Sequence, residues 1–172
     1  GSLCTDAEEP CFSLALLGTD SGLTYPTTAQ WDSFTIEFRV WIDALADAPS
    51  STQLASIQGN EQSLTLQAQS NGIWQISWGP TGVENPLQWN GIGQDTNLTN
   101  QWIHVAVVYS AQTGVRALYI DGIEKAADTP AAPFEPGGEV SGTLGSALKP
   151  FSAFPPLAGR FRYARISSSA RY

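Results

Sequence analysis

The sequence predicts an all-β fold, an antiparallel sandwich of two sheets. Apolar and polar residues alternate most clearly at residues 34–42, and this is the period of a strand with one buried face. At residues 102–109 the larger residues Ile103, Val105, Val107 and Tyr109 alternate with His104, Ala106 and Val108 at the same period. Asn71-Gly72 and Asp121-Gly122 separate extended runs, and such dipeptides are typical of tight turns. No segment combines a helical period with capping residues. Many short strands separated by turns favour a sandwich.

Each expected strand follows from the same two signals, apolar alternation and bounding turn residues. Residues 34–42 place Phe34, Ile36, Phe38 and Val40 on one face and Thr35, Glu37, Arg39 and Trp41 on the other. Pro26 closes the second strand, and residues 129–138, with three Pro and two Gly, form a loop. We expect the buried side of the sandwich to be wholly apolar. In chain order the expected strands are residues 12–17, 23–25, 34–42, 53–58, 63–69, 73–78, 87–90, 102–109, 115–120, 123–127, 139–144 and 157–166.

Length and charge restrict the class of protein. The 172 residues suffice for one domain, which would bury roughly 70% of its unfolded surface. We assign residues 12–172 to this domain and the polar, acidic residues 1–11 to an N-terminal linker. The net charge is −8 with 8 Lys and Arg, so the cationic stripe of a nucleic-acid binder is missing and an anionic membrane surface is disfavoured. No apolar run approaches the ~20 residues of a membrane helix.

The N-terminal residues suggest the compartment. Cys4 and Cys11 can close a short disulfide loop, which would place the protein outside the cell or at its surface; two free thiols in a cytosolic chain are the alternative. The chain opens with Gly1-Ser2 and contains no Met, as expected of a segment excised from a larger secreted or surface protein. Asn97-Leu98-Thr99 matches the glycosylation acceptor pattern, a short pattern that also arises by chance.

Three segments carry a resemblance to a known family. Residues 34–41 read FTIEFRVW, residues 102–122 contain Trp-Ile-His-Val-Ala and Tyr-Ile-Asp-Gly, and residues 157–172 read LAGRFRYARISSSARY. In order and spacing these segments resemble the laminin-G-like domains of the concanavalin A-like lectin and glucanase jelly rolls. The resemblance implies a two-sheet jelly roll over most of the chain.

One departure from this family concerns calcium. Members often carry an acidic residue just before the final Arg-Ile, where it serves a structural calcium ion, but here residues 160–163 read Arg-Phe-Arg-Tyr. Calcium needs several oxygen ligands, and an arginine repels a cation. We therefore expect no cofactor and no metal at this position. Calcium sites at Asp20, Asp95 or Asp121 stay open, with a turn role as the alternative for each.

Catalytic residues are not apparent. A glycosidase needs two carboxyl groups about 5–9.5 Å apart, and strand spacing would place them at alternate positions. Glu37 has Thr35 and Arg39 as its neighbours on that face, and the motif Glu-x-Asp-x-x-Glu is absent. We interpret His104, the single histidine, as a packed or hydrogen-bonded strand residue. The sequence therefore predicts no enzyme.

The six tryptophans are the best indication of binding. Indole rings stack on the faces of sugars while polar neighbours bind hydroxyl groups. The candidate platform consists of Trp41, Trp78 and Trp89, with the polar partners Arg39, Gln88 and Asn90. The alternative is that Trp78, which alternates with Trp74 and Ile76, belongs to the core.

Together these observations favour a non-catalytic extracellular recognition module that binds carbohydrate or protein, for example in cell adhesion. A structural or assembly spacer of an adhesin or fibre is the first alternative. A polysaccharide hydrolase or lyase on the same fold is the second, and it would need clustered carboxylates or a Tyr, His and Arg group.

Overall fold

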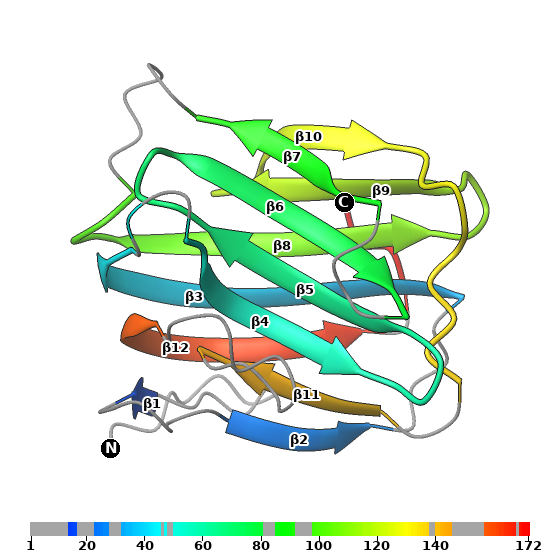
Figure 1. The fold of residues 1–172 in the computed structure, drawn as a ribbon, viewed down its shortest axis with the longest axis horizontal. Coiled ribbons are helices and arrows are strands. Elements are labelled where there is room, and N and C mark those ends of the chain that lie inside the picture. The colour runs from blue at the N-terminus through cyan, green and yellow to red at the C-terminus, as the bar shows by residue number, and fades with distance from the viewer. Residues whose placement is uncertain are drawn as a thin grey trace.

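Two antiparallel sheets lie face to face (Figure 1). The computed structural model describes residues 14–16, 23–27, 32–45, 47, 50–80, 85–91, 98–137, 140–145, 157–167 and 169–172. Within these residues each sheet has six strands. The predicted all-β sandwich is confirmed.

The first sheet, sheet 1, contains the first and the last of the described strands. Its order is β1-β12-β3-β8-β9-β10. The strands are β1 (Leu14–Leu16), β12 (Ala158–Ser167), β3 (Ser33–Ala44), β8 (Trp102–Ser110), β9 (Val115–Ile120) and β10 (Ile123–Asp128).

The second sheet, sheet 2, has the order β2-β11-β4-β5-β6-β7. Its strands are β2 (Leu23–Thr27), β11 (Val140–Leu144), β4 (Thr52–Gln58), β5 (Ser63–Ala68), β6 (Ile73–Gly79) and β7 (Leu87–Asn90). Strands β4 to β7 follow one another along the chain as a meander, whereas β2 and β11 join from distant parts of the sequence (Figure 1).

The predicted strand segments match the observed strands, with small shifts at their ends. The clearest difference is β2, which continues through Pro26 to Thr27. Because β2 pairs with β11 alone and lies at the edge of sheet 2, a proline there need not donate to a second neighbour.

The predicted turns are also present. Asp121 and Gly122 both have positive φ, 50° and 76°, as a two-residue type I′ hairpin requires between β9 and β10. Asn71 accepts a hydrogen bond from the Ile73 amide at 3.1 Å, and Gly72 has φ 86°. Asp121 Oδ1 also accepts a bond from the backbone N of His104 at 2.8 Å, so this aspartate ties the turn to β8.

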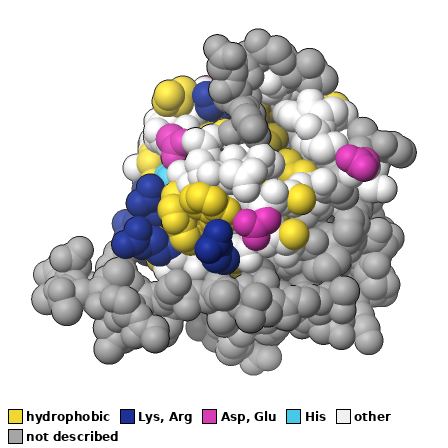
Figure 2. Space-filling view, turned by 90° about the vertical axis from the view of Figure 1, so that its left-hand side faces the viewer, with side chains coloured by type: hydrophobic (Ala, Val, Ile, Leu, Met, Phe, Trp, Pro, Cys, Tyr) yellow, Lys and Arg dark blue, Asp and Glu magenta, His cyan; other side chains and the backbone are white. Residues whose placement is uncertain are grey.

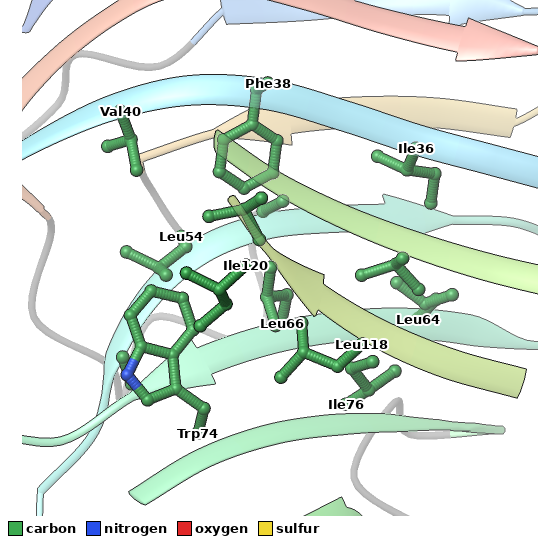
Figure 3. Close-up of a cluster of buried hydrophobic side chains, with 14 of the residues drawn as sticks. Ile36, Phe38, Val40, Leu54, Leu64, Leu66, Trp74, Ile76, Leu118 and Ile120 are labelled. Atoms are coloured by element: carbon green, nitrogen blue, oxygen red, sulfur yellow. The ribbon is translucent and has the colours of Figure 1, made fainter. Parts of the chain in front are cut away.

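The core lies between the sheets. Inward-facing side chains of β3 and β9 meet those of β4, β5 and β6, as Figure 3 shows for ten labelled residues. Strand β8 adds Ile103, Val105 and Val107 to the same cluster. Phe34, Phe38, Leu54, Leu66 and Trp78 are each 0% exposed. Truncating one such phenylalanine to alanine costs about 3–5 kcal/mol in proteins generally, so this packing is the main source of stability.

The expectation of a wholly apolar interior is wrong at one position. Arg116 of β9 points inward and is 1% exposed. Its Nε and Nη2 contact the two Asp128 carboxylate oxygens at 2.7 and 2.9 Å, and its guanidinium lies 4.4 Å from the centroid of a Trp78 ring. Nη2 also donates to the Asn85 carbonyl. The buried guanidinium charge is tolerated because a carboxylate, a carbonyl and an aromatic face take the place of the water molecules that would solvate it.

None of the described segments forms a helix able to span a membrane. Cys4, Cys11, Asp20, Asp95 and Asn97 lie outside the described residues, and so do the proposed linker at residues 1–11 and any disulfide within it.

We predict that Asp128→Ala destabilises the fold, because it leaves the Arg116 guanidinium buried without its carboxylate. The free energy of unfolding, measured by urea denaturation, should fall by roughly 1.5–3 kcal/mol. Asp43→Ala is the matched control: its pair with Arg160 is 3.7 Å long, with side chains 52% and 50% exposed, and should contribute about 1 kcal/mol or less. Equal losses for the two variants would contradict this account of Arg116.

Candidate functional site

The candidate functional side chains of the described residues lie on the outer face of sheet 1. On β3 the core residues alternate with Thr35, Glu37, Arg39 and Trp41, which point away from the core. The neighbouring strands add cross-strand partners. In register, Glu37 lies between Arg165 and Ala106, Arg39 between Tyr163 and His104, and Trp41 between Arg160 and Trp102.

Glu37 is the centre of a buried ionic cluster on this face. Its side chain is 3% exposed. Arg165 of β12 donates to Oε1, and His104 Nε2 of β8 lies 3.3 Å from Oε2. The Tyr172 hydroxyl donates to Oε2 at 2.9 Å. Because protein donors occupy both oxygens, this carboxylate is not available for acid–base chemistry on a substrate.

The C-terminal segment covers the same cluster. Thr35 Oγ1 donates to the Ser169 carbonyl at 2.8 Å and accepts from the Arg171 amide at 3.1 Å. The Tyr172 ring stacks on Tyr119 with centroids 4.9 Å apart. This segment therefore crosses β3 and shields Glu37 from solvent.

The cluster changes the pKa values of its members. Burial alone would raise the pKa of Glu37, but the hydrogen bond from Tyr172, the bond and charge of Arg165 and the bond from His104 together lower it below 4.5. Burial, the hydrogen bond to Glu37 and the charge of Glu37 raise the pKa of Tyr172 to about 12. The carboxylate is thus ionised, and the phenol protonated, at neutral pH.

A second cluster surrounds Trp41, which is partly exposed. Trp102 packs edge-on against it, with centroids 6.0 Å apart and planes at 68°. The Arg160 guanidinium lies 5.0 Å from a Trp41 ring centroid, and Trp41 Nε1 donates to Asp43 Oδ1 at 2.9 Å. The indole is therefore held in one orientation, with a cation over its face and a carboxylate at its edge.

Gly159 contributes to this arrangement. A Cβ at Gly159 would lie 2.2 Å from the Trp41 carbonyl oxygen, so the absence of a side chain lets β12 pair closely with β3 beside Trp41. A β-bulge follows between Phe161 and Tyr163. It places the exposed Arg162 and the half-buried Tyr163 together opposite Arg39.

Arg39 lies between the two clusters. On the strands flanking it, the rings of Tyr163 and His104 stack with centroids 6.1 Å apart and planes at 25°. Arg39 is partly exposed, and its Nε is buried with no hydrogen-bond partner. Among the described residues Arg39 forms no ion pair. It carries a charge that the described fold leaves uncompensated.

Figure 2 shows the end of the molecule where β3 ends and β8 and β12 begin. Hydrophobic side chains gather there in a small patch, with arginine or lysine side chains on two sides and an acidic side chain on the border.

The three tryptophans of the predicted platform do not share a surface. Trp78 and Trp89 are 0% and 6% exposed and belong to the core, so the expectation that they present their rings to solvent is wrong. Trp74, Ile76 and Trp78 all face inward on β6, as the alternative interpretation stated. Trp89 faces inward on β7 and tilts against Trp74 at 6.5 Å. Their alternation with polar residues reflects inward packing.

The predicted polar partners Gln88 and Asn90 lie on the outer face of sheet 2, away from Trp41 and Arg39. Both are exposed. Gln88 donates to Gln75 at 2.8 Å, and Gln75 donates to Ser77 at 2.9 Å. Uncharged polar side chains line this face, among them Ser56, Ser63, Thr65, Gln67, Gln75, Ser77, Gln88 and Thr143.

The described residues contain no group of three or more His, Cys, Asp or Glu able to hold a metal ion. Asp121 has the turn role that was the alternative to calcium binding. His104 is a hydrogen-bonded strand residue, as predicted.

The family follows from a comparison with known proteins. The model of the concanavalin A-like lectin/glucanases superfamily matches residues 17–171. The chain belongs to this superfamily. The expected resemblance is confirmed, and it spans nearly the whole chain. No protein with a curated function matches the sequence.

Solved structures share the fold of this lectin-like domain. A heptameric SAP-like pentraxin from Limulus polyphemus superposes with a TM-score of 0.69 at 14% identity, over 93% of this chain and 77% of the pentraxin. The CBM40 module of a Ruminococcus gnavus IT-sialidase, bound to α2,3 sialyllactose, gives 0.67 at 13% identity and 94% of both chains. A K499G mutant of NanB sialidase from Streptococcus pneumoniae gives 0.70 at 12% identity, over 94% of this chain and 26% of the sialidase. At these identities the likeness shows the fold.

Sequence reasoning did not find the ionic cluster. It considered Glu37 only beside its strand neighbours Thr35 and Arg39 and found no second carboxylate. The partners Arg165, His104 and Tyr172 come from other segments. The sequence did offer one indication of this cluster. Glu37 and its three partners all lie in the segments that resemble the family.

We predict that Glu37→Gln removes a pH-dependent part of the stability. The folded pKa of Glu37 is lowered below 4.5, so the ionised group stabilises the fold above that pH and the contribution is lost as pH falls through the folded pKa. Urea denaturation should show the variant less stable than wild type at neutral pH, with the gap closing in acid. A gap that stays constant with pH would show that Glu37 acts through packing alone.

We also predict that Tyr172 ionises late. A folded pKa of about 12 against an ordinary value of 10 means that the phenol stabilises the fold below pH 10 and that this contribution is lost as pH rises through about 12. Ultraviolet absorbance of phenolate, wild type minus Tyr172→Phe, measures this group separately from the other tyrosines. A difference curve centred on the ordinary value would disprove the contact with Glu37.

Proposed function

We propose that this domain is a non-catalytic module that binds glycans on the outer face of sheet 1, with Trp41 as the stacking surface. The observation that carries the proposal is the geometry of Trp41. Its ring is partly exposed, Trp102 packs against it edge-on, Arg160 lies over one face, and Asp43 accepts a hydrogen bond at the ring edge. An oriented aromatic ring with hydrogen-bonding groups at its edge suits the apolar face and the hydroxyl groups of a sugar.

The likeness to a carbohydrate-binding module supports this proposal. The R. gnavus CBM40 structure contains bound sialyllactose on the same fold. The fold alone is compatible with several functions, so the residues around Trp41 carry the proposal. We further propose a secreted or cell-surface location, where such glycans occur.

The absence of a catalytic role is part of the proposal. Glu37, the carboxylate at the centre of this face, is buried and bonded to Arg165, His104 and Tyr172. A glycosidase needs two carboxyl groups that reach the scissile bond, and a carboxylate enclosed by protein donors cannot do so. The Tyr, His and Arg group that a lyase would need is present here, but it serves to hold Glu37.

We predict that Trp41→Ala abolishes or weakens glycan binding while leaving the fold intact. Loss of one stacking aromatic should reduce affinity about tenfold or more. Wild type and variant are compared on a broad glycan array, and each array hit is then measured by calorimetry.

Gln88→Ala is the control, because it changes an exposed residue on the outer face of sheet 2. Thermal melts confirm that both variants fold. If Gln88→Ala loses binding and Trp41→Ala does not, the site lies on sheet 2. If wild type binds no glycan on the array, the glycan proposal is wrong, and a role in protein adhesion or assembly replaces it.

A further inference from the structure

The positive charges of this acidic chain are concentrated on one face. The chain has a net charge of −8 and eight Lys and Arg residues. Five of these eight belong to β3, β12 or the segment after β12. They are Arg39, Arg160, Arg162, Arg165 and Arg171. The strands β3 and β12 and the segment after β12 are therefore rich in positive charge in a protein that is negative overall. Figure 2 shows lysine or arginine side chains beside the hydrophobic patch at one end of the molecule.

The fold neutralises these arginines unequally. Arg165 is paired with the buried Glu37. Arg160 has a loose, half-exposed contact with Asp43 at 3.7 Å. Arg39 has no ion pair among the described residues, and its Nε lacks a hydrogen-bond partner. Arg39 and Arg160 are therefore two cations beside Trp41 that the described fold leaves incompletely paired.

Both arginines are neighbours of Trp41. Arg160 is its cross-strand partner on β12, and Arg39 is two positions earlier on β3, on the same face. Two positions along a strand span about 6.6 Å, which is comparable with the width of a sugar ring and one substituent. A sugar stacked on Trp41 would place its substituents near one of these guanidinium groups.

We propose that the preferred ligand is an acidic saccharide, whose ring stacks on Trp41 and whose carboxylate or sulfate group pairs with Arg39 and Arg160. This inference rests on the proposed function. A guanidinium matches the geometry of a carboxylate or sulfate with two parallel hydrogen bonds, whereas a neutral sugar needs no such concentration of charge. The remaining negative charge of the chain disfavours long polyanions such as nucleic acid, since their charges would extend beyond the arginines.

The test uses pairs of probes that differ in charge. For carboxylate, oligogalacturonate is compared with its methyl ester, which has the same sugar backbone without the charge. For sulfate, dextran sulfate oligosaccharide is compared with dextran. Affinities of wild type, Arg39→Gln, Arg160→Gln and Trp41→Ala are measured by calorimetry at physiological salt. Lys125→Gln on β10 is the control, because it removes one positive charge at an edge of sheet 1, three strands away from β3.

We expect wild type to bind an acidic probe at least tenfold more tightly than its neutral counterpart. Arg39→Gln and Arg160→Gln should each reduce the affinity for the acidic probe about tenfold, and Lys125→Gln should not change it. Trp41→Ala should reduce the affinity for both the acidic and the neutral probe of a pair. Selectivity within the carboxylate pair, the sulfate pair or both identifies the acidic group.

Three results would overturn the inference. Equal affinity for charged and neutral probes, with both lost in Trp41→Ala, would reject the acidic ligand and leave the glycan proposal intact. Equal losses in Arg39→Gln and Lys125→Gln would show general charge attraction without a site. No binding to these probes or to any glycan on the array would reject the inference and the proposed function together.

Discussion

The outer face of sheet 1 depends on the ionised carboxylate of Glu37. Three strands and the C-terminal segment converge on it, through Arg165 of β12, His104 of β8 and Tyr172. Placing a charge where its side chain is 3% exposed is unfavourable unless every lone pair finds a donor. The cluster therefore specifies one arrangement of β12, β3 and β8, and that arrangement sets the register of the residues beside it.

Strand β3 connects stability with recognition. Its inward residues, such as Phe38 and Val40, are fully buried against sheet 2, and the packing of these side chains fixes the strand. Its outward residues are then fixed too, because successive side chains point to opposite faces. Arg39 and Trp41 thus lie on a strand held between two paired neighbours, so the proposed ligand would require little ordering of the backbone.

The arginines show the same principle in two environments. Arg116 enters the core and is compensated by Asp128 and the face of Trp78, and it stabilises the packing between the sheets. Arg39 and Arg160 lie outside and keep hydrogen-bonding capacity. Pairing with a carboxylate marks the structural arginines on both sides of the sheet, Arg116 with Asp128 inside and Arg165 with Glu37 outside. Residue type alone does not distinguish them from Arg39.

The sequence by itself determined the class of fold, most strand positions and the turns at Asn71-Gly72 and Asp121-Gly122, because alternation and turn chemistry act over a few neighbouring residues. It also identified Arg39 and Trp41 as outward residues of one strand. Only the tertiary structure decided which tryptophans are buried, because that depends on which face of β6 and β7 meets the other sheet. It likewise decided the partners of Glu37, since His104 and Arg165 are 67 and 128 positions away along the chain. Local pattern cannot specify contacts that arise from the order in which distant strands pair.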